Sequence, residues 1–170
     1  MVADATSPRE VKSLSDLTVL VLDGDSGYRQ LMASELRGLG VSSVKSTHTP
    51  QEAIEILDGP IDVLVTEYYV PFIKAIRTNK KRAIRTLPII LVTDRVRKSD
   101  VLKARDAGIN AFVTKPVSAS ALCDHILQAV NDARPIVASQ DFTGPDRRHH
   151  TDSEFSGPER RQDQRAKGEK

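Results

Sequence analysis

From about residue 17 to residue 133, short aliphatic runs alternate with amphipathic stretches. Runs of Val, Leu and Ile without polar interruption are typical of strands that are buried on both faces of a parallel sheet. The pattern predicts five strands, at 18–22, 43–47, 61–66, 88–92 and 111–114, with a helix after each. Such alternation predicts an open α/β fold, in which a doubly wound parallel sheet carries helices on both faces.

Residues that begin and end helices support this division. Thr49, Ser99 and Ser118 are expected N-caps of the second, fourth and fifth helices, because their hydroxyls can accept from free backbone N–H groups. Gly40 and Gly108 are expected to end the first and fourth helices.

The chain divides into three parts by composition. Residues 1–16 are polar and are expected to form a flexible leader, and residues 17–133 form the domain. Residues 134–170 carry 15 charged residues and almost no aliphatic residues after Val137. Such a segment buries too little apolar surface to fold alone, so a disordered tail is predicted.

Composition excludes several classes of protein. The net charge of +2 gives no global attraction to nucleic acid or a membrane. A single cysteine, Cys123, excludes an internal disulfide and a cysteine metal cluster. The sequence shows neither a secretory signal nor an apolar run of about 18 residues, so a cytoplasmic location without membrane contact is expected.

Chemically active side chains follow four of the predicted strands. Asp23 and Asp25 follow the first, Glu67 the third, Thr93 the fourth and Lys115 the fifth. Functional groups of open α/β sheets gather at these carboxyl ends. Clustered carboxylates suit Mg²⁺, while a lysine and a hydroxyl suit a phosphoryl group. The alternative is that Lys115 simply pairs with Glu67 and closes the core.

Five motifs in this order resemble the receiver domains of CheY-type response regulators over about residues 17–131. They are VLVLDGD at 19–25, IDVLVTE at 61–67 with Pro71, LVT at 91–93, AG at 107–108 and FVTKP at 112–116. The resemblance implies a flavodoxin-like, CheY-like sheet with strand order 2-1-3-4-5. The stretch after Pro71 is shorter than receivers usually have, which implies a shortened third helix.

The resemblance also implies roles at the strand ends, with two departures. Glu67 stands where receivers carry the phosphoacceptor aspartate. Asp23 fills the first of two adjacent acidic positions that hold Mg²⁺, and Gly24 replaces the second. Asp25 is an acid displaced by one residue. Bound Mg²⁺ is therefore expected to be weak or absent, with Asp23 as its ligand, and no other cofactor is expected.

Three further positions match the family. Thr93 corresponds to the switch hydroxyl, Phe112 to the switch aromatic residue and Lys115 to the lysine that contacts phosphate. Pro116 matches a proline that often follows a cis peptide bond. The side chain of Glu67 is one methylene longer than aspartate, so a fixed ion pair with Lys115 and loss of ordinary phosphorylation are expected.

Positive charge gathers between residues 74 and 98, where Asp94 is the one acidic residue. The patch comprises Lys74, Arg77, Lys80, Lys81, Arg82, Arg85, Arg95, Arg97 and Lys98. A solvated surface is the ordinary interpretation, and an anionic partner is the functional one.

The tail contains an internal repeat. Residues 142–148, FTGPDRR, recur as FSGPERR at 155–161. Aromatic and arginine side chains are common anchors of interfaces. The expected binding residues are Phe142, Arg147, Arg148, Phe155, Arg160 and Arg161.

These observations favour a non-enzymatic signalling adaptor of two-component systems that works by protein contact. Its partner would bind the tail and the face formed by the helix ending at Gly108, strand 111–114 and the helix capped by Ser118, and a histidine kinase is one candidate. Two alternatives remain. One is a phosphoryl-accepting receiver with an atypical Mg²⁺ site, and the other is a nucleotide or nucleic-acid binder that uses the basic patch and the tail arginines, although nucleic acid is the less favoured partner.

Overall fold

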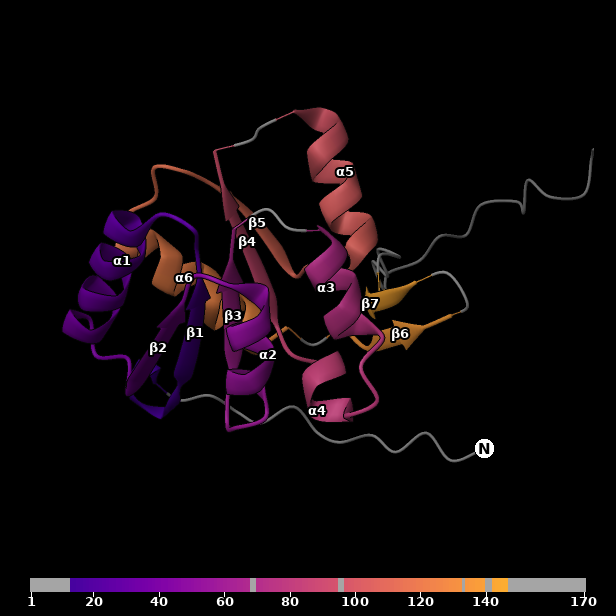
Figure 1. The fold of residues 1–170 in the computed structure, drawn as a ribbon, viewed down its shortest axis with the longest axis horizontal. Coiled ribbons are helices and arrows are strands. Elements are labelled where there is room, and N and C mark those ends of the chain that lie inside the picture. The colour runs from indigo at the N-terminus through magenta and orange to yellow at the C-terminus, as the bar shows by residue number, and fades with distance from the viewer. Residues whose placement is uncertain (1–12, 68–69, 95–96, 133, 140–141, 147–170) are drawn as a thin grey trace, which may run out of the picture.

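The computed structural model of the chain describes residues 13–67, 70–94, 97–132, 134–139 and 142–146. Its centre is a sheet of five parallel strands in the order β2-β1-β3-β4-β5 (Figure 1). The strands are β1 (Thr18–Leu22), β2 (Ser43–Thr47), β3 (Val63–Thr66), β4 (Ile89–Thr93) and β5 (Ala111–Thr114). The predicted fold class and strand order are confirmed. β3 and β4 are wholly buried, as their unbroken aliphatic runs predict.

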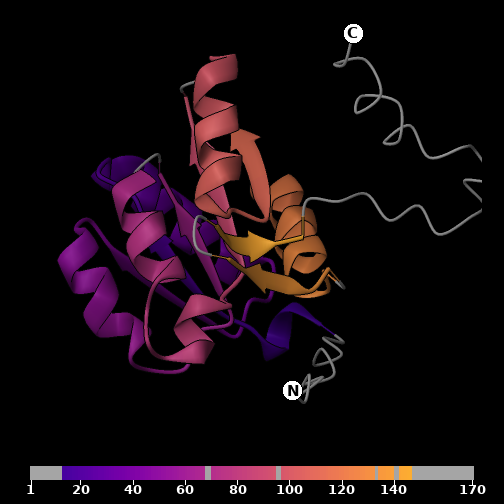
Figure 2. The same ribbon diagram turned by 90° about the vertical axis from the view of Figure 1, so that its right-hand side faces the viewer.

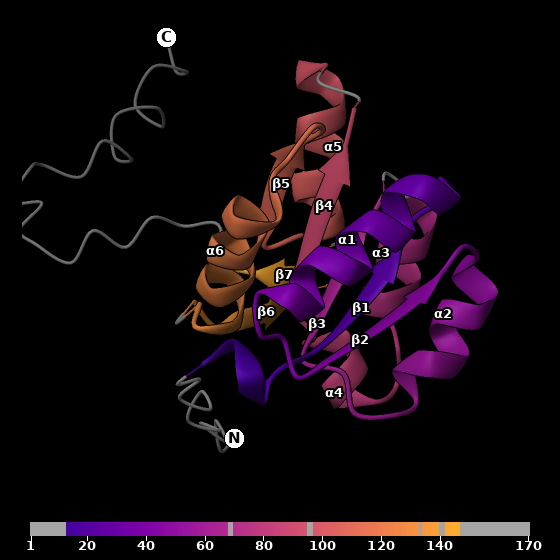
Figure 3. The same cartoon turned by 90° about the vertical axis from the view of Figure 1, so that its left-hand side faces the viewer.

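Helices cover both faces of the sheet (Figures 1 and 3). On one face, α1 (Ser26–Gly38) and α6 (Ala119–Val130) pack over an aliphatic core that includes Leu36 and Ile126. A second core on the other face lies beneath α2 (Pro50–Leu57), α3 (Val70–Arg77), α4 (Arg82–Arg85) and α5 (Lys98–Ala107). A 3-10 turn at Leu14–Asp16 precedes β1. Among the described residues, no helix is both long and apolar enough to cross a bilayer.

Two of the three expected N-caps are confirmed. Thr49 accepts from the N–H of Glu52 at 3.3 Å, and Ser118 accepts from Ala121 at 3.3 Å. The expected cap at Ser99 is wrong, because the N-cap position of α5 is two residues earlier, at Arg97, which makes no side-chain capping bond.

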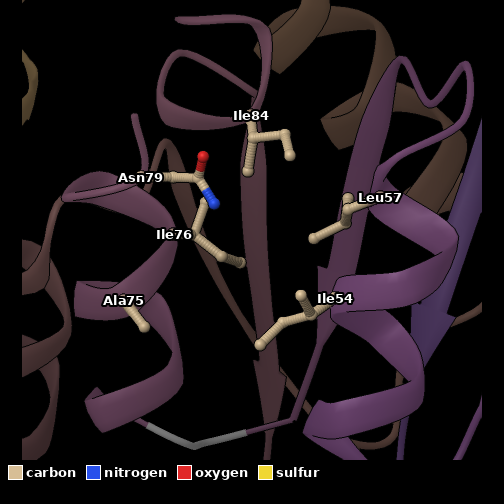
Figure 4. A pocket seen from close by; sticks show the side chains of 6 residues that line it. All are labelled: Ile54, Leu57, Ala75, Ile76, Asn79 and Ile84. Carbon is tan, nitrogen blue, oxygen red and sulfur yellow. The ribbon is translucent and has the colours of Figure 1, made fainter. Parts of the chain in front are cut away.

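The third helix is shortened as predicted. α3 has eight residues, and the four-residue α4 follows it before β4. Between α2, α3 and α4 lies a small apolar hollow of about 30 Å³ (Figure 4). It is lined by Ile54, Leu57, Ala75, Ile76, Asn79 and Ile84.

Arg77 is not part of the basic surface that the sequence suggested. Its side chain is 2% exposed, and burial lowers its pKa to about 10. Its Nε donates to the carbonyl of Gly108 at 2.8 Å, and its Nη1 donates to the carbonyls of Arg85 at 2.9 Å and Leu87 at 2.7 Å. Arg77 therefore ties the end of α3 to the segments before β4 and after α5.

The domain extends beyond the boundary expected at residue 133. β6 (Ile136–Ala138) and β7 (Thr143–Pro145) form an antiparallel hairpin beside α5 (Figure 2). Gly144 and Pro145 are buried. The low aliphatic content of this segment predicts disorder, but the hairpin gains its order from pairing of its own backbone and from close contact with Gly108. Residues 147–170 lie outside the described residues.

Candidate functional site

The carboxyl ends of β1, β3, β4 and β5 bring the predicted site residues to one edge of the sheet. Asp23 follows β1, Glu67 follows β3, Thr93 is the last residue of β4 and Lys115 follows β5. This convergence is a direct consequence of parallel strands, because all of them end at the same edge. The contacts within the group differ from those expected.

Lys115 pairs with Asp23. Its Nζ lies 2.5 Å from Oδ2 of Asp23, and the two side chains are 16% and 3% exposed. The other carboxylate oxygen of Asp23 accepts from the backbone N–H of Asp25 at 2.8 Å. A nearly buried carboxylate needs a cation and further hydrogen bonds to be stable, and both are present.

The expected pair between Glu67 and Lys115 is therefore wrong. Among the described residues, no salt bridge joins them. Oε2 of Glu67 instead accepts from the backbone N–H of Gly24 at 3.3 Å. A Cβ atom on Gly24 would lie 3.5 Å from that oxygen, so even the first carbon of a side chain there would be in van der Waals contact with the carboxylate. The extra methylene of Glu67 thus carries its carboxylate toward the loop after β1, where Gly24 leaves room.

Asp25 has a structural role in the fold. Its carboxylate accepts from the N–H of Tyr28 at 2.9 Å and so caps α1. That hydrogen bond is the largest of the effects that lower the pKa of Asp25. An acid at this position holds the helix end, and its displacement by one residue explains why it does not fill the place of Gly24.

Tyr28 is a site residue that sequence reasoning missed. Nζ of Lys115 lies 4.1 Å from the centre of its ring, within the range of a cation–π contact. Its hydroxyl is buried and has no hydrogen-bond partner within the described part of the chain. Burial, followed by the negative charge of Asp23, raises its pKa to about 12. An aromatic residue on the inner side of a helix gives no sequence signal that separates this role from core packing.

The two residues matched to switch positions lie on the neighbouring strands β4 and β5. Thr93 is fully buried at the end of β4, and Phe112 is half-buried on β5 against the second core. The Lys115–Pro116 peptide bond is cis. Thr66, the last residue of β3, is also buried, and its hydroxyl donates to the carbonyl of Glu67 at 3.1 Å.

A cavity of about 240 Å³ opens beside this edge. Its walls come from the ends of β1 and β3, the loops after β1, β2 and β3, and the first turn of α2. They are formed by Leu22, Asp23, Gly24, His48, Pro50, Gln51, Thr66 and Glu67. The carboxylate of Glu67 therefore has space on the β2 side of the sheet, away from Lys115.

The carboxylates do not fit a Mg²⁺ site. Asp23 is engaged by Lys115, Glu67 by Gly24 and Asp25 by the start of α1. In the described part of the chain, no three His, Cys, Asp or Glu side chains converge as metal ligands. A hard divalent cation requires several oxygen ligands directed at one point, and here the three carboxylates point to separate partners.

The repeated tail units lie partly outside the described residues. Phe142 is half-buried and belongs to the β6–β7 hairpin, so it contacts its own domain. The other five expected binding residues, Arg147, Arg148, Phe155, Arg160 and Arg161, are not among the described residues.

Comparison with known proteins identifies the family of the chain. Chemotaxis protein CheY of Pseudomonas aeruginosa is 27% identical over 117 residues, which cover 65% of this chain and 93% of that protein. CheY1 of Helicobacter pylori is 30% identical over 114 residues, covering 62% and 90%. A response regulator of Chloroflexus aurantiacus has a similar fold, with a TM-score of 0.61, 23% identity and coverage of 67% of this chain and 97% of that chain. The model of the response regulator receiver domain matches residues 19–127, and the chain therefore belongs to that family.

Proposed function

We propose that this receiver domain signals by contact with a partner protein, has no catalytic activity of its own and does not use ordinary aspartyl phosphorylation. The observation that carries the proposal is the ion pair of Lys115 with Asp23, at 2.5 Å and almost shielded from water. The lysine that the family uses to contact phosphate is thereby engaged by an acid of the same domain.

The position of Glu67 supports the same conclusion. Its carboxylate accepts from Gly24 and borders the cavity on the β2 side. Phosphoryl transfer depends on a carboxylate, a cation and a metal that are held in register, and an error of about 1 Å lowers the rate of a reaction strongly. Here the carboxylate and the lysine have different partners, and Gly24 supplies no second acid for a metal.

The partner would bind the face formed by α5, β5 and α6. Leu102 on α5 is 40% exposed, and Phe112 on β5 is half-buried. Exposed apolar and aromatic side chains on such a face are suited to a protein interface. A histidine kinase or a downstream protein would provide the complementary surface.

Intact-mass measurement with a small-molecule phosphodonor and Mg²⁺ tests the proposal. We expect no stable added phosphate on the natural chain. The matched variant carries Gly24→Asp and Glu67→Asp, which restore both acids that the family uses, and we expect it to gain one phosphate. A Mg²⁺-dependent phosphate on the natural chain that is lost in Glu67→Gln would overturn the proposal.

One observation favours the alternative of an atypical phosphoryl acceptor. The 240 Å³ cavity has both Asp23 and Glu67 in its wall and could admit a phosphodonor. The same mass measurement separates the two functions. The nucleic-acid alternative is not proposed, because Arg77 is buried and Lys81 pairs with Asp58 at 2.7 Å.

A further inference from the structure

The first repeat unit is seated on the domain. Its residues 143–145 form β7, which pairs with β6 so that Val137 faces Gly144 and Ala138 faces Thr143. The strand lies against the C-terminal end of α5 (Figure 2). We name the surface formed by β6, Gly108 and the underlying Arg77 the Gly108 dock. The unit is thus held by backbone pairing on one side and by the end of a helix on the other.

The Gly108 dock accepts a strand only if the central residue has no side chain. A Cβ atom on Gly144 would lie 2.7 Å from Cα of Gly108, a distance that real Cβ atoms do not tolerate. A Cβ atom on Gly108 would lie 2.3 Å from the carbonyl oxygen of Thr143, and Gly108 has a φ of +96° that favours glycine. Arg77 holds Gly108 in place through its Nε bond to the Gly108 carbonyl.

The second unit meets the same requirements. Ser156, Gly157 and Pro158 correspond to Thr143, Gly144 and Pro145 of β7, and Phe155 corresponds to Phe142. The contact through residue 143 uses its backbone carbonyl, so serine can replace threonine there. Nothing in the fold of 17–133 requires a second copy of a segment that fits this dock.

We propose that the second unit, residues 155–161, binds the Gly108 dock in competition with the first unit of the same chain. Each chain has one dock and two units, so the docked unit leaves the other available. Four residues join Ala138 to Thr143, and 17 residues would join Ala138 to Ser156. Closing the longer loop costs more entropy and lowers the equilibrium population of the docked second unit roughly ninefold relative to the first. The second unit would therefore occupy the dock in about one chain in ten.

Nuclear magnetic resonance of the full chain tests the competition at the dock. The probes are the backbone amide of Gly108 and the Nε–H of Arg77, which lie in the dock. Gly144→Val should expel the first unit and admit the second, so both signals should stay near their natural positions. Gly157→Val should leave them unchanged. The double variant should shift both. Gly38→Val is the matched control, because Gly38 has open space around its Cβ position.

The outcomes separate the possibilities. In the double variant, an added peptide of residues 153–163 should restore both signals, and the same peptide with Gly157→Val should not. If Gly144→Val alone gives the spectrum of the double variant, the second unit does not use the dock and the proposal fails. A dimer of Gly144→Val at working concentration would show exchange between chains and would contradict competition within one chain. Unchanged melting of all variants excludes general unfolding as the cause.

Discussion

Replacing Lys115 by methionine tests the ion pair on which the site depends. The change keeps an apolar stem of similar length and removes the charge, so Asp23 remains 3% exposed without a cation. Leaving one member of a buried pair alone costs about 3–5 kcal/mol. Loss of the contact with the Tyr28 ring adds about 0.5–1 kcal/mol. We therefore expect Lys115→Met to lower the free energy of unfolding by about 5 kcal/mol.

A double-mutant cycle identifies the partner of Lys115. Asp23→Asn keeps the shape of the side chain and its acceptor for the Asp25 N–H, but removes the charge. The double variant strands no charge, so it should be destabilised by much less than the sum of the single changes, with a coupling of about 2–3 kcal/mol. The matched cycle of Lys115→Met with Glu67→Gln should give less than about 0.5 kcal/mol.

Urea unfolding at neutral pH measures all of these variants. The slope of the free energy against urea should stay the same across the set, which shows that the unfolded states are comparable. A strong coupling to Glu67 together with none to Asp23 would refute the arrangement described above. It would mean that Lys115 pairs with Glu67, the acid that follows β3.

Two further predictions concern buried groups, Tyr28 and Arg77, whose roles the sequence did not predict. Tyr28→Phe should leave the free energy of unfolding at neutral pH unchanged or slightly raised, because it removes a buried hydroxyl that has no partner in the described part of the chain. The variant should also lack the tyrosinate absorbance that develops near pH 12. Folding raises the pKa of Tyr28 to about 12 from its ordinary value of about 10, so ionisation costs more in the folded chain. The free energy of unfolding of the natural chain should therefore fall more steeply than that of Tyr28→Phe as the pH rises from about 10 to about 12. Arg77→Met should destabilise the domain by about 3 kcal/mol in urea unfolding, because it leaves buried carbonyls unsatisfied, whereas Lys74→Met on the exposed side of the same helix should have almost no effect.

Local patterns were sufficient to predict the sheet and the edge on which the site lies. Aliphatic runs located β1, β3 and β4 to within two residues, since strands buried on both faces are rich in Val, Leu and Ile. The caps at Thr49 and Ser118 follow from local backbone bonds. These features depend on residues that are near one another in the chain, and they can be read from it.

The contacts made by long side chains could not be read in the same way. The sequence gives no sign of which carboxylate Lys115 reaches, because that depends on the exact path of three loops. Arg77 belongs to a run of basic residues, and nothing in the sequence distinguishes it, as a buried residue, from the others. The β6–β7 hairpin was missed because its order comes from backbone pairing and a glycine contact rather than from apolar periodicity.

The departures from the family pattern at the site depend on one another in space. An acidic side chain at residue 24 would start from a Cβ atom that lies 3.5 Å from Oε2 of Glu67. Two like charges about 4 Å apart repel by about 1 kcal/mol even in water, so a second carboxylate close to that of Glu67 is unfavourable. Glycine at this position removes the repulsion and supplies an N–H group for Glu67. With Glu67 turned away, Asp23 is the acid left for Lys115. Restoring one acid alone should therefore not restore phosphorylation. A gain of phosphate is expected only when Gly24→Asp is combined with Glu67→Asp.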